Sequence, residues 1–353
     1  MGFSAITEAW NGAVLATRFG SSGSLVIFGG GHTTYYGSDV HAFDLATREW
    51  RRISDGYTSG EPNEYGDGAF YPNAEYPDRS PLPPHNYGYV QYDPVGNDFL
   101  LLKGNSELGH NVKAVAIPHM FNLDRLEWRR GPQHPTAILN SGGFTTWDAS
   151  RRILWGQSGD DGGGNAFIGF CPDGANPDGT FGAWGVMYPS KFAGFANHNA
   201  MQIDPSRDII VVLSHARDTL FAVNPADPGA PPIELRSFGR RPSIAEHAAI
   251  EFAPKLDRLV YYSARHGPAV HTITPPSSRD WPELVSEDWS WEIINGGGLD
   301  PVTDARACSK YPTNWHHTFG RFRVASWQGI DVALLVRHID SPVYAMRLNR
   351  AAR

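Results

Sequence analysis

The chain has 353 residues, enough for one large domain or two, and its 38 glycines, 27 prolines and 12% aromatic residues are typical of an all-β protein with many tight turns. The net charge of -7 argues against nucleic-acid binding as the main task, and two cysteines do not make a disulfide framework. No apolar run reaches the roughly 18 residues of a membrane-spanning helix, so no span is expected.

The first residues, Met1 to Glu8, lack the basic and apolar regions of a secretory signal peptide. We therefore expect the protein to be cytoplasmic as synthesised or to enter a particle such as a virion. It would be secreted only if a leader had been removed.

The first repeated unit lies at residues 12–53. An apolar strand ends at Phe28 and is followed by three glycines and His32. A second strand closes on Phe43-Asp44-Leu45, and a third carries Trp50. This order of strands and turns predicts one four-stranded blade of a repeat protein.

Similar apolar hairpins follow along the chain, with turns rich in Asp, Pro, Asn and Ser that suit a tight reversal. They lie at residues 90–102, 146–154, 202–210 and 251–259, and looser copies lie at 14–27 and 324–333. The six hairpins recur about every 50 to 75 residues, in the range of kelch-type blades.

We therefore predict a single domain, residues 1–353, folded as a six-bladed kelch-like β-propeller. The predicted blades span about 12–53, 85–130, 142–187, 198–236, 247–294 and 319–348. The last blade offers only three strands, and residues 3–10 are expected to supply the fourth and close the ring. Seven blades is the rival count, although no seventh hairpin is evident.

Histidines recur at corresponding places of this repeat. In a propeller, the loops into the first strand of each blade and the turns between the second and third strands lie on one face, which we call the entry face. Ten of the 14 histidines map there: His32, His85, His110, His198, His215, His247, His266, His316, His317 and His338. A histidine in a turn is commonly structural, and we assign that role to His32, His215 and His338. The number on one face predicts a functional site that uses at least three of the ten, and the alternative is a structural role encoded by the repeat.

The entry face also receives the long connections. Residues 54–84, 188–197 and 295–316 join successive blades there, and the first of these carries four tyrosines. Long loops on a rigid scaffold commonly carry binding sites, and tyrosine rings stack readily on sugars. The alternative for residues 54–84 is a solvated lid or a contact with another subunit.

The stretch from Gly29 to Leu45 resembles a kelch blade, in particular the first blade of bacterial and phage propellers with a Gly-Gly-Gly-His-x-x-Tyr-x-Gly-Asn motif. Residues 84–88, Pro-His-Asn-Tyr-Gly, resemble the His-Thr-Tyr that opens the second blade of those proteins. Ulvan lyases belong to this group. The resemblance is good over about residues 10–130 and only architectural afterwards.

The resemblance to ulvan lyases implies a polysaccharide lyase that uses a His and Tyr pair with a nearby Arg. Elimination from a uronic acid needs a base, an acid and a cation that neutralises the carboxylate. His85 and His110 are carried over from the starts of the two blade-two loops, and Tyr188 follows from register. Arg265 and Arg241 are candidates for the cation. The sequence Gly104-Asn105-Ser106-Glu107-Leu108-Gly109-His110 departs from a clean Gly-Gly-His loop.

Substrate-binding side chains are expected at Tyr87, His198, His247, Arg265 and His317. No cofactor is expected. Related lyases carry a structural zinc, for which Cys308, His316 and His317 are the candidate ligands, although their spacing matches no compact zinc motif.

Two functions remain open at this stage. The first is recognition of a surface or extracellular polysaccharide by a tail or host-attachment component of a tailed-phage virion, with other virion proteins as partners. The second is β-elimination of a uronic-acid polysaccharide. Propellers host unrelated tasks, so the fold alone does not decide whether the protein is an enzyme.

Overall fold

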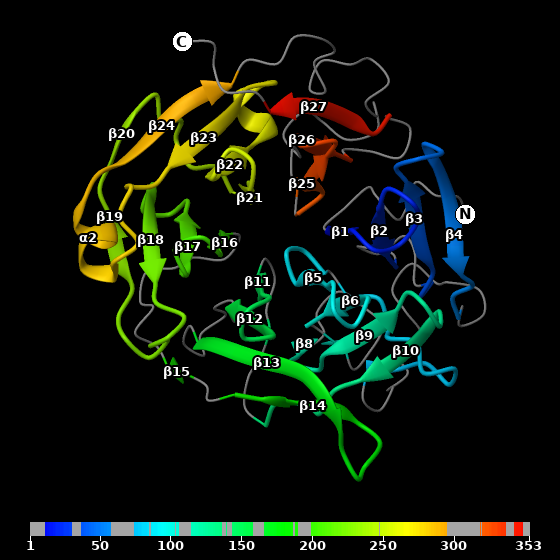
Figure 1. Cartoon of the computed structure of the whole chain (residues 1–353). Helices are drawn as coiled ribbons and strands as arrows, with labels where there is room; N and C mark the ends of the chain where they lie inside the picture. Colours follow the sequence, from blue (N-terminus) through cyan, green and yellow to red (C-terminus); the bar gives the residue numbers. More distant parts are fainter. Residues whose placement is uncertain are drawn as a thin grey trace.

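Six small antiparallel sheets stand in a ring around a central axis in the computed structural model (Figure 1). The structure describes residues 11–29, 37–57, 74–84, 86–102, 104–105, 114–135, 139, 143–157, 166–185, 188–189, 199–246, 248–294, 318, 320–336 and 342–348. The predicted six-bladed β-propeller is therefore confirmed. The predicted closing strand at residues 3–10 lies outside the described residues.

The first three blades each run outward from an innermost strand. Blade one contains β1 (Ala13–Ala16), β2 (Ser24–Phe28), β3 (Val40–Asp44) and β4 (Glu49–Ser54). Blade two contains β5 (Val90–Asp93), β6 (Asp98–Leu101), β9 (His119–Asn122) and β10 (Glu127–Arg130), beside a small hairpin of β7 (Gly104–Asn105) and β8 (Ala114–Val115). Blade three contains β11 (Phe144–Asp148), β12 (Ile153–Gln157), β13 (Ala166–Ala175) and β14 (Phe181–Trp184), and β15 (Tyr188–Pro189) also pairs with β13.

The other three blades follow the same order. Blade four contains β16 (Ala200–Asp204), β17 (Ile209–Ser214), β18 (Thr219–Val223) and β19 (Ile233–Leu235). Blade five contains β21 (Ala249–Ala253), β22 (Arg258–Tyr262), β23 (Val270–Thr274) and β24 (Trp289–Ile294), and β20 (Ser237–Gly239) adds a parallel edge strand. Within it, a 3-10 turn, η2 (Ala264–His266), precedes β23, and a short helix, α2 (Trp281–Ser286), precedes β24. Blade six shows β25 (Phe322–Trp327), β26 (Ile330–Leu335) and β27 (Tyr344–Leu348).

The repeated turn of the sequence has a repeated geometry. In blades two, three and four, an aspartate ends the innermost strand, and its carboxylate accepts a backbone N–H from two residues further on. The turn then closes on a residue with positive φ: Asn97, Arg152, Asp208 and, in blade five, Asp257. Asn and Asp tolerate this left-handed conformation better than most side chains, which explains their recurrence in these hairpins.

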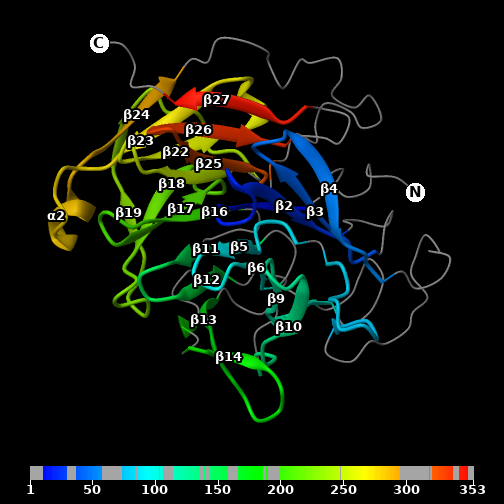
Figure 2. The ribbon, with the colours of Figure 1, turned by 45° about the vertical axis from the view of Figure 1, so that its right-hand side comes forward.

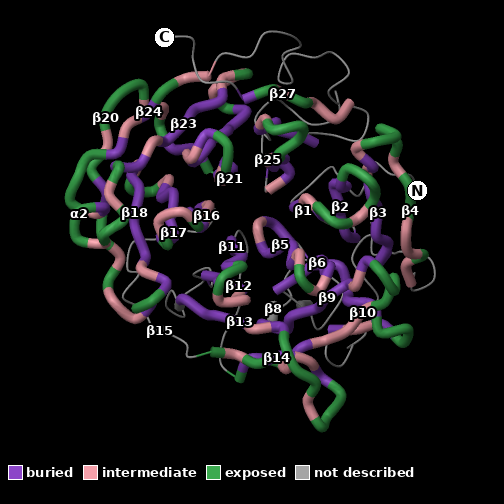
Figure 3. Tube along the Cα trace, in the orientation of Figure 1, coloured by how far each residue is buried: buried purple, intermediate pink, exposed green. Residues whose placement is uncertain are grey.

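Apolar side chains of neighbouring sheets fill the spaces between the blades. Figure 2 shows these sheets packed side by side, and Figure 3 shows that the inner strands are mostly buried while the outer ones are largely intermediate or exposed. One cluster joins Val211 and Leu213 of blade four to Tyr261, Trp289 and Trp291 of blade five. The hydrophobic core is thus divided among the gaps between blades, and each inner strand is covered on both faces.

Arginines of blade six link the two ends of the described ring. Arg321 donates from Nη1 to the carbonyl oxygen of Asn11 at 3.0 Å, and Arg323 donates from Nε to that of Ala13 at 2.7 Å. Both arginines are buried and both start or precede β25, the innermost strand of the blade. The two rigid guanidinium groups therefore connect blade six to blade one by donating hydrogen bonds to main-chain carbonyl oxygens.

Candidate functional site

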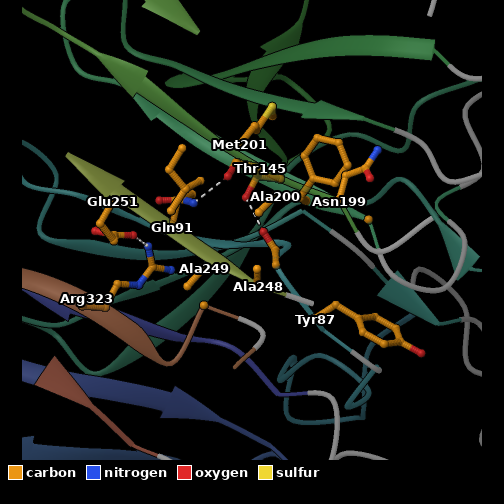
Figure 4. A pocket seen from close by; sticks show the side chains of 15 residues that line it. Tyr87, Gln91, Thr145, Asn199, Ala200, Met201, Ala248, Ala249, Glu251 and Arg323 are labelled. Atoms are coloured by element: carbon orange, nitrogen blue, oxygen red, sulfur yellow. Dashed lines mark hydrogen bonds and ion pairs between the residues drawn. The ribbon is translucent and has the colours of Figure 1, made fainter. Parts of the chain in front are cut away.

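A pocket of about 40 Å³ lies at the entry face, where the innermost strands of blades two to six begin (Figure 4). Each of these blades contributes one short segment at or just before the start of its first strand. The lining side chains and glycines are Tyr87, Gly88, Gln91, Gly143, Phe144, Thr145, Asn199, Ala200, Met201, Ala248, Ala249, Ile250, Glu251, Gly320 and Arg323. The pocket therefore forms at the face on which the sequence placed the recurrent histidines.

A buried ion pair occupies one side of this pocket. Arg323 Nη1 lies 2.5 Å from Glu251 Oε1, and the two side chains are only 8% and 14% exposed. Arg323 also donates from Nη2 to the carbonyl oxygen of Val90 at 3.3 Å. Burial raises the pKa of Glu251, and the positive charge of Arg323 opposes that rise. The pair joins blade five to blade six beside the axis.

Neutral polar groups form another part of the wall. Gln91 donates from Nε2 to the carbonyl oxygen of Thr145 at 2.8 Å, and the Thr145 hydroxyl donates to the carbonyl oxygen of Gly88 at 2.8 Å. Figure 4 shows Gln91 reaching toward Thr145 and shows the Tyr87 ring pointing away from Glu251 and Arg323. These bonds fix Gln91 and Thr145 between blades two and three, so the wall is preorganised.

Asn199 connects the pocket to the rim of the entry face. Its Oδ1 lies 3.0 Å from His215 Nδ1 and accepts the His215 backbone N–H at 3.2 Å. The Asn199 Nδ2 atom is buried without a hydrogen-bond partner among the described residues. His215 belongs to the turn after β17, so this contact holds that turn against the start of β16.

At the rim, the neutral imidazole of His215 lies near the carboxylate of Glu246 and the guanidinium of Arg265. His215 Nε2 lies 3.8 Å from Glu246 Oε1. Burial lowers the pKa of His215, the carboxylate of Glu246 opposes the fall, and the positive charge of Arg265 adds to it. Arg265 is exposed, and its guanidinium makes no hydrogen bond or ion pair with the described residues. It is therefore a cation available to a ligand.

The two arginines proposed from the sequence differ in this respect. Arg241 donates from Nη2 to Asp218 Oδ2 at 2.8 Å and from Nη1 to the Asp218 carbonyl oxygen, so its charge is matched. Arg265 lies in η2, where its backbone N–H is capped by the Ser263 hydroxyl at 3.3 Å. Of these two arginines, only Arg265 has a positive charge that no described residue neutralises.

Most of the predicted site residues lie outside the part of the chain that the structure describes. His85, His110, His198, His247, His316, His317 and Cys308 lie outside the described residues, and only the backbone of Tyr188 is described, in β15. Tyr87 borders the pocket, but its side chain is 4% exposed and packs in the cluster with Leu100 and Trp147. Asn199 and Ala248 of the pocket wall directly follow His198 and His247 in the chain.

Three histidines outside the predicted set occupy equivalent places in the third strands of their blades. His41, His119 and His271 are all buried, and they pair in register with Ile27, Leu101 and Tyr261 of the second strands. Burial lowers the pKa of His41 to about 4 and that of His119 to about 3. None of the three lines the pocket, so their repetition does not reflect convergence on it.

Sequence reasoning missed Glu251, Arg323 and Asn199 as pocket residues. A signal was present, because Glu251 and Arg323 are charged residues inside otherwise apolar predicted strands. A charge at such a position is retained only with a partner or a function. The pairing itself joins residues from different blades and could not be read from either segment.

No helix among the described residues is long and apolar enough to cross a membrane. Within the same residues, no group of three or more His, Cys, Asp or Glu side chains is arranged to hold a metal ion. The proposed zinc ligands Cys308, His316 and His317 lie outside those residues.

No protein-family model matches the chain. No curated protein matches it either. Among solved structures, the α-L-arabinofuranosidase Arb93A from Fusarium graminearum is 9% identical, with a TM-score of 0.48 over 96% of this chain and 92% of that one. A chain of a nidogen–laminin complex is 12% identical, with a TM-score of 0.41 over 74% of each chain. TolB from Acinetobacter baumannii is 10% identical, with a TM-score of 0.36 over 74% of this chain and 59% of TolB. Likenesses of this size carry no information about function.

Proposed function

We propose that the protein recognises a glycan at the entry face, with the pocket between the innermost strands as its binding site. The observation that carries this proposal is the pocket wall, where Gln91, Thr145, Glu251 and Arg323 present fixed hydrogen-bonding groups in a small concave site. Such convergent polar groups on a rigid scaffold suit a ligand rich in hydroxyl groups. The exposed cation of Arg265 at the rim adds a contact for an acidic substituent.

The biological setting that we propose is a tail or host-attachment component of a tailed-phage virion, binding a surface polysaccharide of the host. The support is the resemblance of residues 29–45 to the kelch-like blades of bacterial and phage propellers. Such a component would also contact other virion proteins.

Binding of the full chain to an array of surface polysaccharides tests this function. For an acidic glycan that binds, Arg265→Gln is expected to weaken the affinity about tenfold, because the substitution removes a cation of the rim that no described residue neutralises. Arg125→Gln is the matched control, because Arg125 is exposed in the turn between β9 and β10, at the opposite end of the blades. Absence of binding to every glycan, or equal weakening by both variants, would contradict the proposal.

Polysaccharide lyase activity of the ulvan-lyase kind is the second candidate. The observation that favours it is the neutral His215 beside the unmatched Arg265, since elimination needs a base and a cation for the uronate carboxylate. Incubation with uronic-acid polysaccharides, ulvan included, would then produce the ultraviolet absorbance of an unsaturated sugar. We expect that signal to disappear in His85→Ala and His110→Ala if the carried-over pair is catalytic. A flat trace from folded protein would leave glycan binding alone.

A further inference from the structure

The Glu251–Arg323 pair has hydrogen-bonding capacity that the described residues do not use. A guanidinium carries five N–H donors, and Arg323 directs three of them to Ala13, Val90 and Glu251. The other two have no acceptor among the described residues. The Glu251 carboxylate can accept about four hydrogen bonds, and Arg323 and the Val324 backbone N–H account for two.

Gln91 adds a further acceptor to the same pocket. Its Nε2 is engaged by the Thr145 carbonyl oxygen, which fixes the amide and leaves Oε1 without a partner among the described residues. The pocket therefore offers donors from Arg323 beside acceptors from Glu251 and Gln91. A ligand group that fits must both donate and accept hydrogen bonds within a short distance.

The charge of the pair limits which ligands fit. The positive charge of Arg323 is already matched by Glu251 at 2.5 Å, so a carboxylate entering this pocket would meet the negative charge of Glu251. An apolar group would leave the remaining N–H donors buried and unsatisfied, which is costly. Neutral hydroxyl groups meet both requirements.

The pocket also limits size. A volume of about 40 Å³ has room for about three water-sized groups, which suits hydroxyl groups at the edge of a sugar. Two hydroxyl groups on adjacent ring carbons have a separation similar to that of Arg323 Nη1 and Glu251 Oε1.

We infer that the pocket binds a vicinal pair of hydroxyl groups of the ligand sugar, one donating to Glu251 and the other accepting from Arg323. This inference rests on the proposed glycan recognition and adds its specificity. The pocket selects ligands by the position of their neutral hydroxyl groups, while Arg265 at the rim contacts an acidic substituent of the ligand.

The test uses the full chain and a polysaccharide that it binds on the array. Mild periodate cleaves the carbon–carbon bond between vicinal hydroxyls, and subsequent borohydride reduction removes the aldehydes. We expect this treatment to weaken binding about tenfold or more, and monosaccharides lacking one of the two hydroxyls to compete at least about tenfold less well than the parent sugar. These measurements need no variant, so they hold even if changes at the buried pair impair folding.

Variants supply the second arm. Glu251→Gln is expected to weaken binding about tenfold, because the neutral amide is a poorer acceptor and no longer orients Arg323. Glu292→Gln is the matched control, because Glu292 lies in β24 of the same blade, where it pairs with Arg258 of β22 and does not line the pocket. Unchanged affinity after periodate treatment and in Glu251→Gln, with Arg265→Gln still weakening binding, would overturn this inference and leave glycan recognition intact. No binding to any glycan would overturn both.

Discussion

Replacing Arg323 with methionine is expected to lower the free energy of unfolding by about 3–5 kcal/mol. The substitution leaves Glu251 buried without its countercharge and removes the donors to the carbonyl oxygens of Ala13 and Val90. These contacts join blade six to blades one, two and five, so their loss weakens the ring near its axis. Chemical unfolding followed by tryptophan fluorescence measures the change.

The control for this prediction is Arg347→Met, which removes an exposed arginine from β27 of the same blade and is expected to change stability by less than about 0.5 kcal/mol. The double variant Arg323→Met with Glu251→Met should recover much of the loss, because no unpaired charge remains. If Arg323→Met were as stable as the control, the pair would contribute nothing to closure of the ring.

Acidification from pH 6.5 downward is expected to destabilise the propeller through its buried histidines. The pKa of His41 falls from 6.5 to about 4, chiefly through burial, and that of His119 falls from 6.5 to about 3, through burial and the nearby Arg130. Burial also lowers the pKa of His271. Each histidine is neutral in the folded protein and takes up a proton on unfolding. Titration of each histidine therefore leaves the free energy of unfolding unchanged above pH 6.5 and lowers it as the pH falls from 6.5 toward the folded-state pKa.

The expected slope is up to about 1.4 kcal/mol per pH unit for each histidine that stays neutral. We compare the free energy of unfolding of the wild type and of His41→Gln over this pH range. The slopes against pH should differ by the amount that corresponds to one proton taken up on unfolding. Comparing slopes is necessary because four buried carboxyls have raised pKa values and act in the opposite sense: Glu75, Asp98, Asp204 and Glu251. Arg125→Gln removes no group that titrates in this range and should leave the slope unchanged. Parallel curves for wild type and His41→Gln would show that His41 is accessible to protons in the folded protein.

The hairpins are the part of the fold that short segments specify. The aspartate that ends the innermost strand and the following Pro, Ala or Ser set the turn through contacts two or three residues apart. Alternating apolar residues then mark the strands on either side. Because these signals are local and repeated, counting them was enough to predict six blades.

The histidines show what local sequence patterns do not predict, namely where each side chain lies in the folded protein. Position in the repeat assigned ten of them to one face, but the same reasoning gave no role to His41, His119 and His271, which are buried in the third strands of their blades. Tyr87 likewise keeps its expected place beside the pocket while its ring packs into the core of blades two and three. Period-two alternation tells which side of a strand a residue occupies, but both sides are covered in a propeller.

The sequence by itself therefore determined the all-β class, the number of blades and the face on which the innermost strands begin, because turn chemistry and strand alternation act over a few residues. Only the tertiary structure decided that Glu251 meets Arg323, that His215 meets Asn199, and that Arg241 pairs with Asp218 while no described residue pairs with Arg265. The physical reason is that the Glu251–Arg323 contact joins segments 72 residues apart, brought together where blade six packs against blade five. Whether a charge is neutralised depends on such neighbours, and no local pattern encodes them.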